Sequence, residues 1–236
     1  MLLAAFGLIE RYSRAPMVPP RVVRDRNRGG ANAVMLLLGA GLLAMFYLLT
    51  LYMQVVRGYS AVHTGLAYLP FVAGVGVASG GLGPRLIGAL PVRIVIAAGM
   101  LLCAGGLAWY VAMLTPTSDY FVVMLPAMLA GGTGTGLTFI GCTVTGMRDV
   151  APRDSGVAAG LLNASVQVGN ALGLGALAAI ASMVTRSRLG GHAVTAALTD
   201  GYVAGLLAGA VIFTAGAVVA LCTVNARISA AEAAPH

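Results

Sequence analysis

The sequence predicts an all-α membrane protein with six transmembrane helices, and three observations support this fold class. Hydrophobic residues make up 59% of the 236 residues and charged residues only 9%, whereas a soluble domain has roughly 25% charged residues. The hydrophobic residues form six blocks of about 20 residues or more, and each block can cross a hydrocarbon core roughly 30 Å thick. The blocks do not alternate apolar and polar residues, as the strands of a membrane barrel would.

The elements follow one another in a simple order along the chain. Residues 1–9 are apolar but too short to cross a bilayer, so we expect them to be the stub of a preceding transmembrane helix. Residues 10–30 hold six arginines and three prolines, which predicts an irregular cytoplasmic linker, either lying on anionic head groups or simply solvated. A six-helix domain (31–225) and a cytoplasmic tail (226–236) complete the chain. The predicted spans are 31–56, 64–84, 94–114, 120–145, 156–184 and 201–224.

The arginines predict how the helices are oriented. If the first span runs outward, eleven arginines fall in inside segments and three, Arg57, Arg186 and Arg188, fall in outside loops. This positive-inside bias predicts that both termini are cytoplasmic and that the protein lies in the plasma membrane. Membrane topology then explains the net charge of +7, and nothing else in the sequence indicates a nucleic-acid partner.

The sequence indicates neither an enzyme nor a metal or cofactor site. Ser, His and acidic residues do not cluster as nucleophilic catalysis requires, and no His, Cys and carboxylate set has ligand spacing. The three cysteines fall inside predicted spans, where small buried residues are expected. The segment GGTGTG (131–136) lacks a P-loop lysine and the dinucleotide fingerprint, so we interpret it as a site of close helix packing.

Two span openings are similar to each other. Thr64–Ala67 opens the second span on the outer side, and Ser155–Ala158 opens the fifth span on the inner side. Such a relation predicts two inverted three-helix repeats, an arrangement found in many secondary transporters, although so short a similarity can arise by chance.

Three segments carry a family resemblance. ERYSRAPMVPPRVVRDRN precedes the first span, LYMQVVRGYSAVHTGLAYLP crosses the first outer loop, and APRDSGVAAGLLNASVQVGNALG opens the fifth span. Together they resemble the carboxy-terminal half of the major facilitator superfamily, in its fourteen-helix branch of drug:proton antiporters. The chain departs from that family where Val166 replaces a basic residue and where GPRLIGALPVR lacks an acidic one.

The resemblance implies a half-bundle whose first and fourth helices line a substrate cavity. On the first span Tyr47, Thr50 and Gln54 share a face by their spacing, and on the fourth span Met128, Thr135, Thr138 and Cys142 share a face with Phe139 beside them. We therefore predict that Tyr47, Thr50, Gln54, Thr135, Thr138 and Phe139 line a cavity for a small amphipathic organic substrate. The alternative is that the threonines bond carbonyls one turn back and that Tyr47 and Gln54 mark the interface.

The fifth span carries a glycine and amide face. Gly156, Gly160, Asn163, Gln167 and Asn170 fall on one side of a helix. Such residues permit close approach and hydrogen bonds between membrane helices, so we favour packing over substrate contact. The resemblance implies that this helix faces an amino-terminal half-bundle, which makes the face an inter-bundle seam.

Acidic residues are absent from the centres of the predicted spans, and Asp154 and Ser155 are expected to cap the fifth helix. If the protein is coupled to protons, the titrating carboxylate would have to come from the partner half. The sequence thus predicts a transporter, or half of one, that exports drug-like molecules by alternating access. A non-transporting truncated product or membrane interaction subunit, and a metabolite importer or uniporter, are the alternatives.

Overall fold

The computed structural model describes residues 25–115, 119–189 and 194–224, and these ranges contain six helical spans. The stub 1–9, most of the linker and the tail 226–236 lie outside the described residues. The spans run Arg26–Val56, Ala61–Ala89, Val92–Met113, Tyr120–Met147, Pro152–Arg188 and Val194–Thr223. The prediction of an all-α membrane fold with six long apolar helices is confirmed.

Several spans are built from more than one helical segment. The first consists of α3 (Arg26–Leu51) and the π-helix η1 (Tyr52–Val56). The second consists of α4 (Ala61–Ala67), α5 (Leu69–Val77), the π-helix η2 (Ala78–Leu82) and α6 (Gly83–Ala89). The third is α7 (Val92–Met113), and the fourth is η3 (Tyr120–Met124) with α8 (Leu125–Met147). The fifth is a 3-10 turn η4 (Pro152–Asp154) with α9 (Ser155–Arg188), and the sixth is α10 (Val194–Thr223).

The first helix begins earlier than the sequence predicted. Residues 26–30 were assigned to the linker, but they form the first turns of α3. The reason is a helix cap, because the Asp25 carboxylate accepts a hydrogen bond from the Arg28 backbone N–H at 2.9 Å. The sixth helix also begins early, so Asp200 lies inside α10 rather than in a loop.

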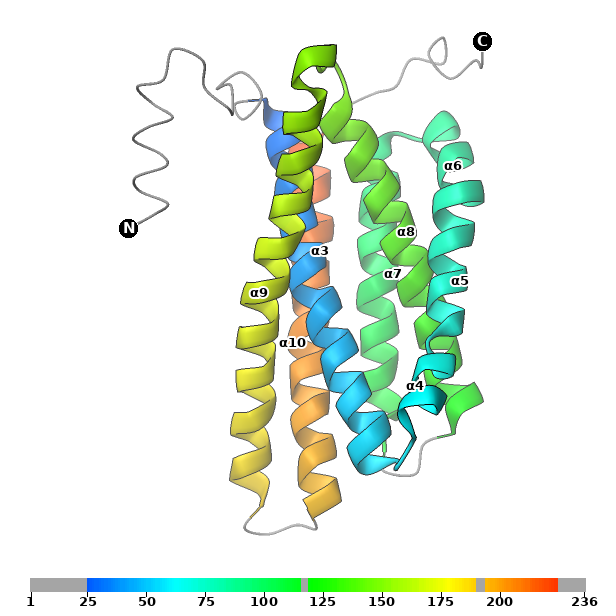
Figure 1. Cartoon of the computed structure of the whole chain (residues 1–236), viewed down its shortest axis with the longest axis vertical. Coiled ribbons are helices and arrows are strands. Elements are labelled where there is room, and N and C mark those ends of the chain that lie inside the picture. The colour runs from blue at the N-terminus through cyan, green and yellow to red at the C-terminus, as the bar shows by residue number, and fades with distance from the viewer. Residues whose placement is uncertain (1–24, 116–118, 190–193, 225–236) are drawn as a thin grey trace, which may run out of the picture.

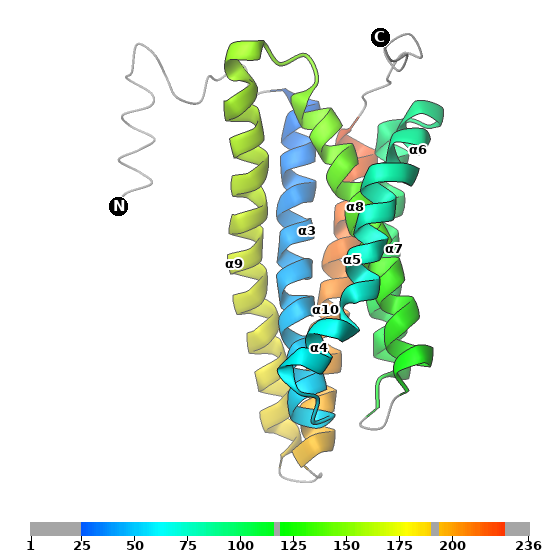
Figure 2. The same cartoon turned by 45° about the vertical axis from the view of Figure 1, so that its right-hand side comes forward.

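The helices are arranged in two layers. Figure 1 shows α9, α3, α8 and α5 across the front, with α10 and α7 behind them, and Figure 2 shows how α5 and α6 stand at one edge of the bundle. We call the end that carries Asp25 and the α8–α9 connection the inner end, and the end that carries the α9–α10 connection the outer end.

Burial is unequal among the spans. In the most apolar window of each span, 56% of the residues are buried in the first and third spans and 61% in the fourth, but only 22% in the second and in the fifth. The second and fifth spans therefore present long, uncovered faces at opposite edges of the front layer (Figure 1).

Glycines let helices in this bundle approach closely. A Cβ added at Gly39 of α3 would meet the Val166 carbonyl oxygen of α9, and one added at Gly134 of α8 would meet the Gly99 carbonyl oxygen of α7. Gly132 of α8 lies in the same way against the backbone of Phe71 in α5. The interpretation of GGTGTG as a packing segment is therefore confirmed.

Candidate substrate cavity and inter-bundle face

Thr50 of α3 belongs to an aromatic cluster between the first and second spans. The Tyr68 hydroxyl donates its single hydrogen to the Phe46 carbonyl oxygen at 3.0 Å, so the Thr50 hydroxyl, 3.1 Å away, donates to Tyr68. The Phe46 ring centroid lies 4.8 Å from that of Tyr68 and 4.9 Å from that of Phe71. Sequence analysis did not find this cluster, because its members come from separate spans and share no spacing.

The other two residues predicted on the first span lie elsewhere. Tyr47 lines a pocket between α3, α9 and α10, on a different side of α3 from the aromatic cluster. Gln54 is exposed in η1, where the change from α- to π-helix alters the spacing on which the prediction relied. The structure therefore does not bring Tyr47, Thr50 and Gln54 together on one face.

The predicted residues of the fourth span divide between the interior and the surface of the bundle. Thr135 and Thr138 are 8% and 0% exposed, and their hydroxyls donate to the Gly131 and Gly134 carbonyl oxygens at 2.8 Å. Thr138 lies against Gly99 of α7, which agrees with the alternative of carbonyl bonding one turn back. Phe139, by contrast, is 51% exposed.

The glycine and amide face of α9 is uncovered in the described part of the chain. Gly156, Gly160, Asn163 and Gln167 are exposed and Asn170 is partly buried. A Cβ added at either glycine would meet no atom within 4 Å. The amides partly satisfy each other, since Asn170 Nδ2 donates to Gln167 Oε1 at 2.9 Å.

A different face of α9 packs on α3. Gly169 and Gly173 lie directly against the α3 backbone, at Leu36 and Ala40 respectively. Nearby, the Ser165 hydroxyl donates to Asn32 Oδ1 at 3.0 Å. Sequence analysis missed this contact, although the spacing of four between Gly169 and Gly173 is the usual signal of close helix approach.

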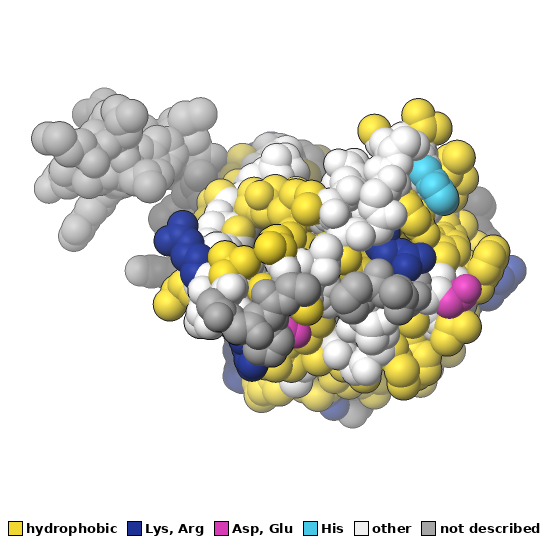
Figure 3. Space-filling model, turned by 90° about the horizontal axis from the view of Figure 1, so that it is seen from below, with side chains coloured by type: hydrophobic (Ala, Val, Ile, Leu, Met, Phe, Trp, Pro, Cys, Tyr) yellow, Lys and Arg dark blue, Asp and Glu magenta, His cyan; other side chains and the backbone are white. Residues whose placement is uncertain are grey.

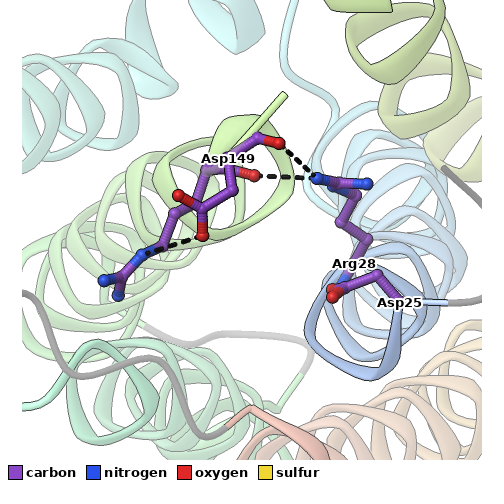
Figure 4. A network of polar contacts seen from close by, with 4 residues as sticks. Asp25, Arg28 and Asp149 are labelled. Carbon is purple, nitrogen blue, oxygen red and sulfur yellow. Dashed lines mark hydrogen bonds and ion pairs between the residues drawn. The ribbon is translucent and has the colours of Figure 1, made fainter. Parts of the chain in front are cut away.

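At the inner end, Arg28 of α3 holds the end of α8. Its guanidinium Nη2 donates to the Arg148 and Asp149 carbonyl oxygens at 2.9 and 3.2 Å, as Figure 4 shows. α8 ends at Met147 and Arg148 is extended, while Asp149 has a left-handed backbone with φ at 53°. Both carbonyls therefore belong to the turn that directly follows the helix. Arg28 is only 9% exposed, and no motif in the sequence indicates that it reaches across the bundle.

The predicted cap of the fifth helix is wrong. Asp154 occupies the N-cap position with a helical backbone and makes no capping hydrogen bond, because the turn η4 continues directly into α9. The Ser155 hydroxyl instead donates to the Pro152 carbonyl oxygen at 2.8 Å. Among the described residues, no three His, Cys, Asp or Glu side chains lie close enough to hold a metal ion.

Known proteins resemble this chain. Residues 10–174 match the family model of the Major Facilitator Superfamily. The chain is 35% identical to the puromycin resistance protein pur8 of Streptomyces alboniger, over 98% of this chain and 47% of that protein. It is 36% identical to the cephamycin export protein CmcT of Amycolatopsis lactamdurans, over 75% of this chain and 36% of that protein.

A third relative is the multidrug resistance protein Stp of Mycobacterium tuberculosis, 30% identical over 75% of this chain and 32% of that protein. The chain thus spans less than half the length of these curated relatives. The family match covers more than half of the chain and agrees with six apolar spans packed as a bundle. The chain therefore belongs to the Major Facilitator Superfamily and is a multi-pass membrane protein.

Proposed function

We propose that the chain forms the carboxy-terminal half-bundle of a transporter that exports drug-like or amphipathic organic molecules. The observation that carries the proposal is the pair of uncovered faces on the second and fifth spans, where only 22% of the residues in the most apolar window of each span are buried. An amino-terminal half-bundle of complementary shape would cover both faces and enclose the front of α3 and α8. Relatives named for puromycin resistance, cephamycin export and multidrug resistance support export as the direction of transport.

Alternating access is the mechanism that this arrangement favours. The half-bundle would rock as one unit against its partner, because glycine contacts join α3 to α9 and α7 to α8 by their backbones. Thr50 and Phe139 remain the predicted residues best suited to meet substrate, since the first is only partly buried and the second is exposed.

Proton coupling would draw on the partner half. Among the described acidic residues only Asp200 lies within an α-helix, about two turns from its outer end, and its carboxylate is 3.9 Å from the Arg188 guanidinium. A residue already paired with a cation at a helix end is a poor carrier of protons across the bilayer. We therefore propose that the titrating carboxylate belongs to the amino-terminal half-bundle.

The proposal is tested by supplying that half. We would express the chain in a drug-hypersensitive bacterium, alone and together with the amino-terminal part of the Streptomyces alboniger puromycin resistance protein. Puromycin resistance, and proton movement in everted vesicles on adding puromycin, are expected only when both halves are present. Robust resistance from the chain alone, or none from the pair despite normal membrane abundance of both, would contradict the proposal.

The seam is tested by matched glycine variants in the same strain. The double variant Gly156→Leu, Gly160→Leu fills an uncovered face of α9 and is expected to abolish co-purification of the two halves. Gly105→Leu is the control, because Gly105 of α7 is equally open but belongs to the back layer. Equal co-purification in both variants would remove the α9 face from the interface.

Asp200→Asn is expected to leave drug-induced proton movement intact.

A further inference from the structure

A pocket of about 250 Å³ lies between α3, α9 and α10 in the outer half of the bundle. Its walls are Leu48 and Leu51 of α3, Ala178 and Ala181 of α9, and Leu198 of α10. Its polar lining comprises Tyr47, Ser182, Thr185, Arg186 and Tyr202. The pocket is therefore amphipathic, and it holds no acidic side chain.

Two hydroxyls in this pocket are available to a ligand. Tyr202 is only 6% exposed, yet neither its hydroxyl nor that of Tyr47 makes a hydrogen bond to the described part of the chain. A phenol left without a partner at membrane depth is costly, because lipid tails cannot accept its hydrogen. Ser182 and Thr185 differ, since their hydroxyls already donate to the Ala179 and Ala181 carbonyl oxygens at 2.9 Å.

Arg186 supplies a positive charge at the mouth of the pocket. It is exposed and makes no ion pair with a described residue, whereas its neighbour Arg188 lies 3.9 Å from the Asp200 carboxylate. Figure 3 looks along the bundle from this end, where hydrophobic side chains predominate and charged side chains are scattered. A free guanidinium beside an apolar surface is suited to a phosphate that carries hydrocarbon chains.

The depths of these groups match the layers of a bilayer. At about 1.5 Å per residue, Tyr47 lies about 13 Å from the middle of α3 and Tyr202 about 10 Å from the middle of α10. Arg186 lies about 22 Å from the middle of α9. The hydrocarbon core ends about 15 Å from the bilayer centre, and the head groups extend to about 22 Å. With side chains that reach several ångströms, the two phenols approach the ester level and Arg186 stands at the phosphate level.

We propose that this pocket binds one anionic phospholipid from the surrounding leaflet. The phosphate accepts hydrogen bonds from Arg186, the glycerol ester oxygens accept them from Tyr47 and Tyr202, and an acyl chain lies along Leu48 and Ala178. The lack of an acidic side chain favours an anionic head group over a choline head group, because a choline cation finds no counter-charge there. The proposal is independent of any transport activity.

Lipid retention measured by native mass spectrometry tests the proposal. The purified full chain would be exchanged into mild detergent containing either dioleoyl phosphatidylglycerol or dioleoyl phosphatidylcholine. We expect one phosphatidylglycerol to be retained and phosphatidylcholine to be retained at least several-fold less. Arg186→Gln is expected to weaken phosphatidylglycerol binding about tenfold, as expected for loss of one charge-assisted hydrogen bond.

Arg188→Gln is the matched control, because it removes the same charge from the same helix end without changing the pocket lining. Ala178→Trp, which fills the pocket and leaves every charge in place, is expected to abolish retention, and Tyr202→Phe to weaken it several-fold. A thermal unfolding scan in detergent without added lipid identifies any variant that is misfolded.

Three outcomes would overturn the proposal. Equal losses in Arg186→Gln and Arg188→Gln would mean that only general surface charge attracts the lipid. Unchanged retention in a folded Ala178→Trp variant would place the lipid elsewhere. Equal retention of the two lipids would remove the selectivity that the pocket chemistry requires.

Discussion

At the scale of single residues, the close packing of α3 and α9 depends on glycines, which have no Cβ atom. Gly169 and Gly173 of α9 lie against the backbone of α3 at Leu36 and Ala40, and Gly39 of α3 lies against the Val166 carbonyl oxygen. At each of these positions a Cβ would overlap the main chain of the other helix, which cannot move aside as a side chain can. Gly156 and Gly160 differ, because the space beside them is open.

This contrast predicts opposite results for the same substitution. Gly173→Ala would push α9 away from Ala40 and is expected to lower the free energy of unfolding by about 1–3 kcal/mol, as overpacking does. Gly160→Ala is expected to be neutral or to stabilise by up to about 1 kcal/mol, because alanine favours the helix. Thermal or SDS-induced unfolding, followed by the fluorescence of Trp109, the single tryptophan, measures both. Equal stability of the two variants would show that the glycine contact is not tight.

The cavity residues allow a second prediction at this scale. In a complete transporter, Phe139→Ala and Thr50→Ala are expected to lower drug resistance several-fold at unchanged membrane abundance, because Phe139 is exposed and Thr50 is only partly buried. Thr138→Ala is expected to have little effect, since Thr138 is fully buried and bonds its own helix. Growth at graded drug concentrations, with immunoblotting for abundance, gives the comparison. A loss of drug resistance confined to Thr138→Ala would indicate that the cavity lies on the side of α8 that packs against α7.

At the scale of elements, Arg28 couples the start of α3 to the end of α8. The Arg28 guanidinium donates two hydrogen bonds to the Arg148 and Asp149 carbonyl oxygens, in the turn that directly follows α8. The two helices expected to line the cavity are thereby fixed to each other at the inner end. Any opening of the cavity there would have to move them together.

Removing this guanidinium should loosen the inner end. Arg28→Gln is expected to cost about 1–3 kcal/mol of stability, because it removes two hydrogen bonds made by a charged guanidinium. Amide hydrogen exchange should accelerate at residues 143–149, in the last turn of α8 and the turn that follows it. Arg26→Gln is the control, since Arg26 is exposed and its guanidinium donates to the Cys222 carbonyl oxygen of α10 rather than to the α8 end. Acceleration in both variants alike would mean that Arg28 contributes only surface charge.

At the scale of the whole molecule, the distribution of arginines predicts which end of the bundle faces the cytoplasm. The arginine bias predicts that the α8–α9 connection is cytoplasmic and that the α3–α4 connection is outside. Both connections contain exposed residues, Ala151 in the first and Ser60 in the second, so they can be probed chemically.

Cysteine labelling would decide the orientation. Cys103 and Cys142 are buried and can remain, whereas the exposed Cys222 is replaced by serine. In intact cells, a membrane-impermeant maleimide is expected to label a Ser60→Cys variant and to spare an Ala151→Cys variant until the membrane is broken. The reverse pattern would invert the orientation.

Much of the fold could be predicted from the sequence, because each of the six uncharged blocks is long enough to span a bilayer as a helix. A helix satisfies its backbone hydrogen bonds internally, as lipid requires. Span ends were less accurate, since the Asp25 cap draws polar residues into α3. The candidate cavity was only partly predicted. Spacing of 100° per residue placed Tyr47 and Thr50 together, but it could not show that α9 and α10 cover the Tyr47 side while Tyr68 covers Thr50.

The glycine contacts between α3 and α9 also bear on how such a chain diverges over time. Main-chain atoms are the same in every residue. A helix contact made through them therefore restricts the choice of amino acid only at the few positions that must remain glycine. A saturation scan should therefore find narrow intolerance at Gly39, Gly169 and Gly173 and wide freedom at the exposed positions between them. Lineages could exchange the residues that meet a substrate while inheriting an unchanged scaffold.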